Sequence, residues 1–225
     1  MKLVKCGKIV VASLCMMATL AGAAMPALAI SPAGCTSLAQ IEEMNDDEET
    51  QVQALKAAIA KVNVKYDEVQ QSWEFDSPIY DKAEKNKTCC LSPWIYIFDG
   101  CKDVYFDEDF SYNGSSCIDL NTVYVRAGDN LYTYECDPDY TDYAYDTDKK
   151  VWWALSNFEM EPSEIDWLRE MLSAKTIITR YSGASGAQYD YTWPADDRQA
   201  VTDMVNLYDL LVAASPEVRA RALRG

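Results

Sequence analysis

Apolar residues recur with two different periods along the chain, and this change constrains the fold more than any other feature of the sequence. From about residue 89 to 155, short runs of β-branched and aromatic residues predict strands. Between residues 52 and 73 the spacing alternates between three and four, which is the heptad pattern of an amphipathic helix. The heptad members are Val52, Leu55, Ile59, Val62, Tyr66, Val69 and Trp73.

The heptad allows two kinds of packing. The helix can pair with a second copy as a coiled coil, or it can pack within its own chain. Positions e and g carry no interlocking charge code, and Tyr66 and Trp73 are bulky for a dimer seam. Intramolecular packing is therefore favoured, and homo-oligomerisation is the alternative.

Strands are expected where apolar and aromatic residues cluster between turn signals. Residues 127–130 contain Gly128 and connect two of these runs, so they predict a hairpin. Residues 137–150 are polar and rich in tyrosine, and we expect them to form a loop. The expected strands are Trp94–Phe98, Val104–Phe106, Thr122–Arg126, Leu131–Glu135 and Val151–Leu155.

The last third of the chain predicts a helix, a hairpin and a second helix. Pro162 and Ser163 open the first helix, and Ser215 and Pro216 end the second. Between them, residues 175–181 and 187–193 form strands around the turn 182–186. Together with the preceding patterns, this predicts an α+β fold: a long N-terminal helix, a disulfide-stapled antiparallel sheet, and a C-terminal helix-hairpin-helix packing on it.

The first 29 residues resemble a secretory signal peptide in pattern. Lys2, Lys5 and Lys8 precede an apolar run, and Ala27 and Ala29 supply the small residues before a cleavage site. We therefore expect export to the periplasm or outside the cell, with no membrane span after cleavage. The remaining chain divides into a linker (30–36), a helical segment (37–80), an α+β domain (81–215) and a basic tail (216–225). Three tail arginines suit the negative C-terminal end of the preceding helix: Arg219, Arg221 and Arg224.

Cysteine usage agrees with an exported protein. Cleavage after Ala29 leaves an even number of cysteines, which can pair fully. Cys89 and Cys90 are adjacent, and a bond between them is disfavoured because successive side chains of a strand point to opposite faces. The expected disulfide cysteines, with their pairing open, are Cys35, Cys89, Cys90, Cys101, Cys117 and Cys136.

The charge and the absence of histidine exclude several functions. The formal charge of −16 disfavours nucleic acid as a partner, since phosphate binding requires Lys and Arg. Without histidine, the Ser-His-Asp and Cys-His nucleophiles and the usual zinc sites cannot form. No sequence motif calls for a cofactor. Carboxylates and aromatic surfaces are the chemistry that this composition leaves available, and one acidic run consists of Asp99, Asp103, Asp107, Glu108 and Asp109.

The segment from Asp137 to Asp148 is the candidate binding site, because exposed tyrosines among aspartates suit the recognition of proteins or glycans. The candidate ligand-binding residues are Asp137, Asp139, Tyr140, Asp142, Tyr143, Tyr145 and Asp146. Calcium is an alternative ligand, since oxygen-rich loops bind it, although this loop fits the EF-hand pattern poorly. Its ligands would be Asp137, Asp139, Asp142, Asp146 and Asp148.

Three functional hypotheses follow. The first is a secreted, non-enzymatic binding protein whose partner is a cationic protein or a glycan, which its charge favours. The second is a small hydrolase that uses a pair of carboxylates on glycans. The third is a structural protein that assembles through the helix from Val52 to Trp73. No catalytic residue is assigned, and a non-enzymatic function is favoured.

Overall fold

The computed structural model describes residues 48–98 and 103–224. The expected signal peptide, the linker, Cys35 and Cys101 lie outside these residues. The helices are α2 (Glu48–Ile59), α3 (Ile79–Asn86), α4 (Pro162–Ser173), α5 (Ala195–Ala213) and α6 (Pro216–Arg224), with a short 3-10 turn, η2 (Pro138–Tyr140). The strands are β1 (Asn63–Asp67), β2 (Ser72–Asp76), β3 (Cys90–Phe98), β4 (Tyr105–Gly114), β5 (Leu120–Ala127), β6 (Asn130–Glu135), β7 (Thr141–Asp146), β8 (Val151–Glu159), β9 (Ile177–Gly183) and β10 (Gln188–Thr192).

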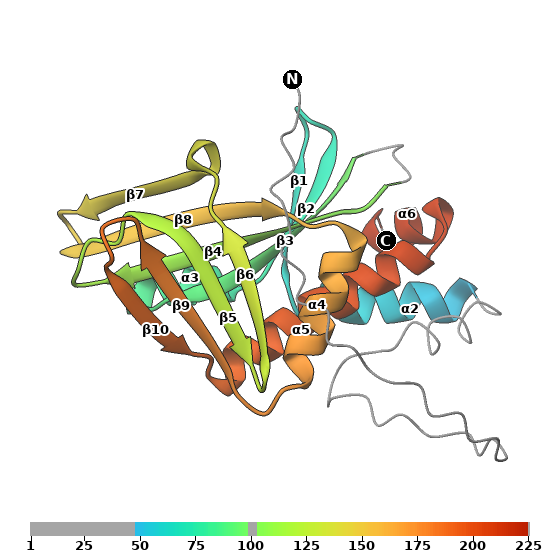
Figure 1. Ribbon diagram of the computed structural model, residues 1–225. Coiled ribbons are helices and arrows are strands. Elements are labelled where there is room, and N and C mark those ends of the chain that lie inside the picture. The colour runs from blue at the N-terminus through green and yellow to red at the C-terminus, as the bar shows by residue number, and fades with distance from the viewer. Residues whose placement is uncertain (1–47, 99–102, 225) are drawn as a thin grey trace, which may run out of the picture. The chain divides into compact units, whose positions relative to one another are not determined.

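The strands form two antiparallel sheets. One has six strands in the order β1-β2-β3-β4-β8-β7, and the other has four in the order β10-β9-β5-β6. The predicted α+β class is therefore confirmed. Figure 1 shows helices α4 and α5 and the four-stranded sheet below strands β4 and β8 of the larger sheet. Side chains alternate between the two faces of each strand, so one face of the larger sheet meets these elements and the other does not.

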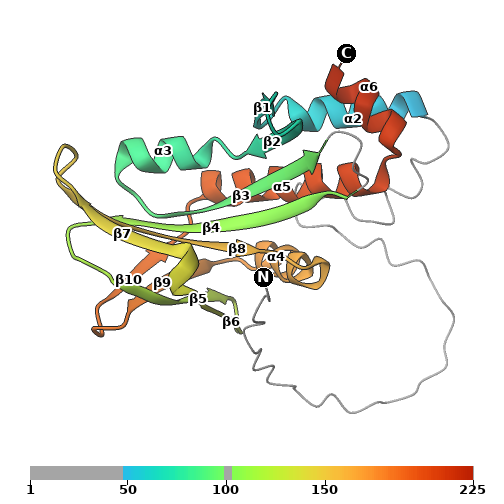
Figure 2. The ribbon, with the colours of Figure 1, turned by 90° about the horizontal axis from the view of Figure 1, so that it is seen from above.

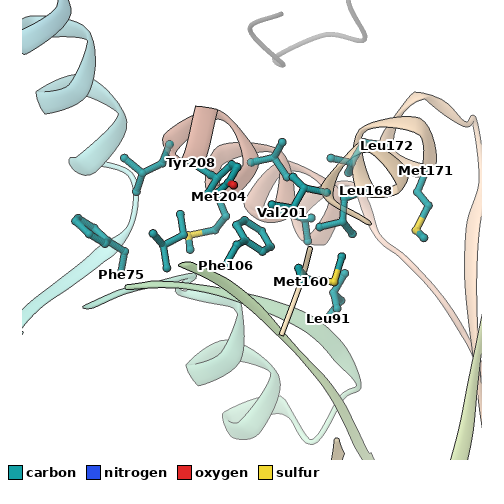
Figure 3. Close-up of a cluster of buried hydrophobic side chains, with 14 of the residues drawn as sticks. Phe75, Leu91, Phe106, Met160, Leu168, Met171, Leu172, Val201, Met204 and Tyr208 are labelled. Carbon is teal, nitrogen blue, oxygen red and sulfur yellow. The ribbon is translucent and has the colours of Figure 1, made fainter. Parts of the chain in front are cut away.

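The main core lies between the larger sheet and helices α4 and α5 (Figure 3). Phe106 of β4 packs edge-to-face against Tyr208 of α5, with ring centroids 5.3 Å apart. Val201 and Met204 of α5 and Leu168 of α4 are completely buried in the same cluster. These contacts show which face of β4 points inward: the face that carries Phe106 and, by alternation, Glu108 and Phe110.

The N-terminal prediction was partly wrong. Helix α2 ends at Ile59, and β1 and β2 replace the second half of the expected helix. Val62, Val64 and Tyr66 also alternate with polar residues, so this segment satisfies a strand pattern as well as a heptad. Pairing of β2 with β3 decides in favour of the strand, since it extends the larger sheet. Residues 63–76 therefore belong to the sheet rather than to a separate helical segment.

The surface required for assembly through the Val52–Trp73 helix is accordingly not present. Val52 and Leu55 are buried within the chain, where α2 packs against α5 and α6 (Figure 2). Val69, a member of the predicted heptad, lies in the β1–β2 turn with 94% of its surface exposed. The side chain of Asp67 accepts hydrogen bonds from the backbone of Val69 and Gln70 and stabilises this turn.

The C-terminal prediction was confirmed. Helix α4, the β9–β10 hairpin and helix α5 follow in the expected order. A capping box between Glu161 and Glu164 begins α4, with proline at the first turn. Residues 216–224 form a helix, α6, where a tail was expected. The predicted role at the end of α5 is confirmed for Arg219, because its Nε donates to the carbonyl oxygen of Leu211 at 2.6 Å. It is wrong for Arg221, which forms ion pairs with Glu48 and Glu49 of α2 instead.

Two further expectations differ from the structure. The segment expected to be a loop between residues 137 and 150 contains strand β7, which pairs with β8 along its whole length. The second concerns the disulfides. Cys89, Cys90, Cys117 and Cys136 have free thiols, so no disulfide joins any two of the cysteines in residues 48–98 and 103–224. Hydrophobic packing and strand pairing hold the described sheets together.

Candidate functional site

Strand β7 separates the aspartates and tyrosines that the sequence placed in one site. Asp142 and Asp146 point to one face of the sheet, while Tyr143 and Tyr145 point to the other. Tyr145 packs on Trp152, with ring centroids 5.3 Å apart. Asp146 accepts hydrogen bonds from the backbone of residues 148 and 149, which lowers its pKa and ties it to the turn after β7. The strand therefore does not present its carboxylates and rings as one surface.

The remaining members of that predicted site lie in and beside the η2 turn. Asp137 caps it by accepting a hydrogen bond from the backbone of Asp139 at 2.9 Å. Tyr140 is 55% exposed. Among the described residues, no group of three or more His, Cys, Asp or Glu side chains is placed to hold a metal ion.

A different set of acids converges on the six-stranded sheet, on the face turned away from α5. Asp76, Trp94, Asp107 and Glu159 are direct cross-strand neighbours on β2, β3, β4 and β8. Directly opposite residues have Cβ atoms about 4.5–5.5 Å apart, so Asp107 and Glu159 are in contact range of each other, and Trp94 separates Asp76 from Asp107. The row crosses the consecutive strands β2, β3 and β4 and then β8, which is distant from them in the sequence.

Neighbouring rows on the same face extend this acidic, aromatic character. Glu74 pairs with Tyr96 on one side of the central row, and Asp109 pairs with Asn157 on the other. Helix α3 lies beside β3 (Figure 2). Its Tyr80 packs edge-to-face on the indole of Trp94. We call this surface the acidic face; it consists of Glu74, Asp76, Trp94, Tyr96, Asp107, Asp109 and Glu159.

Hydrogen bonds fix several of these carboxyl groups in place, mostly through neutral partners. Asn157 donates to Asp109 at 2.9 Å, and Asn63 donates to Asp76 at 2.6 Å. Among the described residues, one ion pair reaches the acidic face: Lys65 Nζ lies 3.3 Å from a carboxylate oxygen of Glu74, with the lysine largely exposed. An exposed ion pair of this kind neutralises little of the negative charge on the acidic face.

The pKa values record this excess of negative charge. Burial, followed by repulsion from Glu159 and Asp109, raises the pKa of Asp107 to about 6. Burial also raises the pKa values of Asp109 and Asp76, against the opposing effect of their amide partners. The same carboxylates raise the pKa of Tyr96 to about 12, after the larger effect of burial. The acidic face thus holds carboxyl groups whose ionised forms are poorly compensated.

Sequence reasoning found part of this surface and missed the rest. The run containing Asp107 and Asp109 was identified as acidic, but Glu74, Asp76 and Glu159 were not connected to it. Their positions within strands were the available signal. Their register was not readable, because it depends on which distant strands pair.

The comparisons with known proteins do not place the chain in a family. No protein-family model matches the sequence, and neither a curated protein nor a solved structure matches it. Within residues 48–98 and 103–224, no helix is both long and apolar enough to cross a membrane.

Proposed function

We propose that this protein is a secreted, non-enzymatic binding protein whose acidic face recognises a cationic protein. The observation that carries the proposal is the cross-strand row of Asp76, Trp94, Asp107 and Glu159. Asp107 in this row is partly desolvated and is repelled by Glu159 and Asp109, as its raised pKa indicates. Such uncompensated charge on a shaped surface is typical of functional sites.

A lysine or arginine side chain suits this surface in two ways. Its charge would relieve the repulsion between Asp107 and Glu159, which would lower the pKa of Asp107 and release a proton near pH 6. Its stem and head group would also pack on Trp94 and Tyr96, since cations are attracted to aromatic faces. The formal charge of −16 adds long-range attraction, which accelerates encounter at low salt.

The test is titration with a short synthetic arginine-rich peptide, with binding measured by calorimetry and by tryptophan fluorescence. The double variant Asp107→Asn/Glu159→Gln should weaken binding roughly tenfold, because it removes the half-buried and the exposed carboxylate that would contact the cation. The matched control, Asp129→Asn/Glu135→Gln, removes the same charge from exposed positions on and beside β6 and should change the affinity less than twofold. Equal losses in the two double variants would show that net charge alone attracts the peptide, and the proposal would fail.

Proton linkage gives a second readout. Binding to ionised Asp107 should weaken as the pH falls below about 6, because the protonated acid no longer attracts the cation. Asp107→Asn should remove most of this dependence between about pH 5 and 7. An unchanged pH profile in that variant would contradict the assignment of Asp107 to the contact surface.

A carboxylate-based hydrolase acting on glycans is the second candidate function. The specific observation is that Asp107 and Glu159 are directly opposed on adjacent strands, with the pKa of Asp107 raised to about 6 beside Trp94. A glycosidase requires two such carboxyl groups, one of them protonated. Release of reducing sugar from polysaccharides, abolished by either Asp107→Asn or Glu159→Gln, would support hydrolysis. If the unaltered protein releases no reducing sugar from any of the polysaccharides tested, the hydrolase function is ruled out.

Export and cysteine pairing complete the proposal. Residues 1–29 have the pattern of a cleavable signal peptide, and the six cysteines that follow are even in number. Mass spectrometry of the protein from an exporting host should show loss of residues 1–29. Only Cys35 and Cys101 remain to pair with the four cysteines whose thiols are free in the structure. Thiol titration of the unfolded, unreduced protein should then find at least two free cysteines but fewer than six, whereas six free thiols would contradict oxidative pairing.

A further inference from the structure

A separate hollow of about 420 Å³ lies on the four-stranded sheet. It is lined by Tyr124 and Arg126 of β5, Leu131 of β6, Ile178 and Arg180 of β9, and Gln188 and Asp190 of β10. These side chains occupy the face turned away from the core, because the alternating residues of the same strands, such as Val123 and Val125, are completely buried. Its volume is within the range of small-molecule sites.

The strand register builds this hollow from two cross-strand rows. In one, Tyr124, Arg180 and Asp190 are neighbours on β5, β9 and β10. In the other, Leu131 and Ile178 stand on either side of Arg126, on β6 and β9. An apolar and aromatic floor therefore surrounds two guanidinium groups, on a chain that carries 16 more acidic than basic residues.

The two arginines differ in their partners. Arg180 donates through Nε and Nη2 to the two carboxylate oxygens of Asp190, at 2.6 and 2.7 Å. That bidentate pair fixes the guanidinium and leaves its Nη1 unused. Arg126, which is exposed, has no hydrogen bond or ion pair to another described residue. The hollow therefore presents the whole guanidinium group of Arg126 to a ligand. Beside it lies the guanidinium group of Arg180, which Asp190 already holds in one orientation.

We infer that this hollow binds a small organic monoanion, in which a carboxylate is attached to an apolar or aromatic body. Arg126 would hold the carboxylate through paired hydrogen bonds, which planar guanidinium groups form with carboxylates. The body would pack on Tyr124, Leu131 and Ile178. A polyanion is disfavoured because the net charge of −16 repels each additional negative charge. A monoanion interacts mainly with the two nearby arginines, because salt screens the more distant charges.

The probe is 4-fluorobenzoate, with binding followed by fluorine NMR on the folded full chain. The dissociation constant should rise roughly tenfold in Arg126→Gln, since a charge-assisted fork is lost. Arg126→Lys should give an intermediate value, because lysine keeps the charge but not the fork. The control Lys85→Gln removes the same charge from helix α3 and should leave the constant unchanged. Uncharged 4-fluorobenzyl alcohol should bind the unaltered protein at least tenfold more weakly.

Several results would overturn the inference. These are no detectable binding at millimolar probe, equal weakening in Lys85→Gln and Arg126→Gln, or equal binding of the alcohol. Tighter binding of polyglutamate than of 4-fluorobenzoate would overturn the preference for a monoanion. Circular dichroism of each variant separates lost binding from lost folding. The acidic face lies on the other sheet, so Asp107→Asn/Glu159→Gln should leave probe binding intact, and the two sites are tested independently.

Discussion

Glu108 provides the sharpest test of the packing between the two sheets. Its side chain is completely buried on the inward face of β4, directly opposite Phe158 of β8. Phe158, Phe110 and Tyr134 form an aromatic cluster there, with ring centroids 4.8–5.7 Å apart. The Tyr134 hydroxyl faces the carboxyl group, yet neither Glu108 oxygen has a described partner within ordinary hydrogen-bond geometry. Burial raises the pKa of Glu108 to about 8, so the folded protein keeps this acid protonated at neutral pH.

The sign and size of the effect follow from proton linkage. The folded protein binds this proton more tightly than the unfolded chain, whose glutamate pKa is 4.5. The contribution to stability is therefore complete below pH 4.5 and is lost as the pH rises towards about 8. At 1.36 kcal/mol per pKa unit, the loss between about pH 6.5 and 8.5 is about 2 kcal/mol. This pH range begins above the pKa of Asp107, which is about 6, so the titration of Asp107 adds little to the change in stability.

Glu108→Gln should remove that slope, because glutamine resembles the protonated acid in shape and cannot ionise. The assay is urea unfolding, followed by tryptophan fluorescence at intervals across the range, with the free energy of unfolding extrapolated to water. Glu135→Gln, an exposed acid on β6, is the control and should keep the slope of the unaltered protein. If Glu108→Gln also retains a loss of about 2 kcal/mol, Glu108 is ionised in the folded state and the reasoning is wrong.

Three further predictions test the packing. Leu55→Ala should lower the free energy of unfolding by about 2–4 kcal/mol, because Leu55 is 1% exposed. Val69→Asp should change it by less than about 0.5 kcal/mol, because Val69 lies in an exposed turn. Equal losses in urea unfolding would favour the continuous helix. Asp209→Ala should cost about 2–3 kcal/mol in the same assay, since this buried carboxylate pairs with an arginine of α4, and a neutral result would contradict the pair. In reduced protein, Cys117 should react first with a thiol reagent and Cys89 only on unfolding, because burial raises the pKa of Cys89 to about 12; peptide mapping checks the order.

Local pattern predicted the C-terminal half of the fold well. The hairpin of β5 and β6 and the unit from α4 to α5 are each formed by neighbouring segments, with turn residues and caps at their ends. The N-terminal region was predicted less well. Residues 62–66 satisfy both a helical and a strand period, and local propensity does not choose between them. Pairing with β3 makes the choice, and it is a contact with a distant part of the chain.

The sequence by itself determined the α+β class, the −16 charge and the absence of histidine, because these depend on composition and local periodicity. Only the tertiary structure decided which charges act together. Asp76, Asp107 and Glu159 become neighbours through strand register, and Arg126 and Arg180 come to line one hollow in the same way. A shift of one residue in any of these pairings would move a side chain to the other face, so the site depends on packing across the whole sheet.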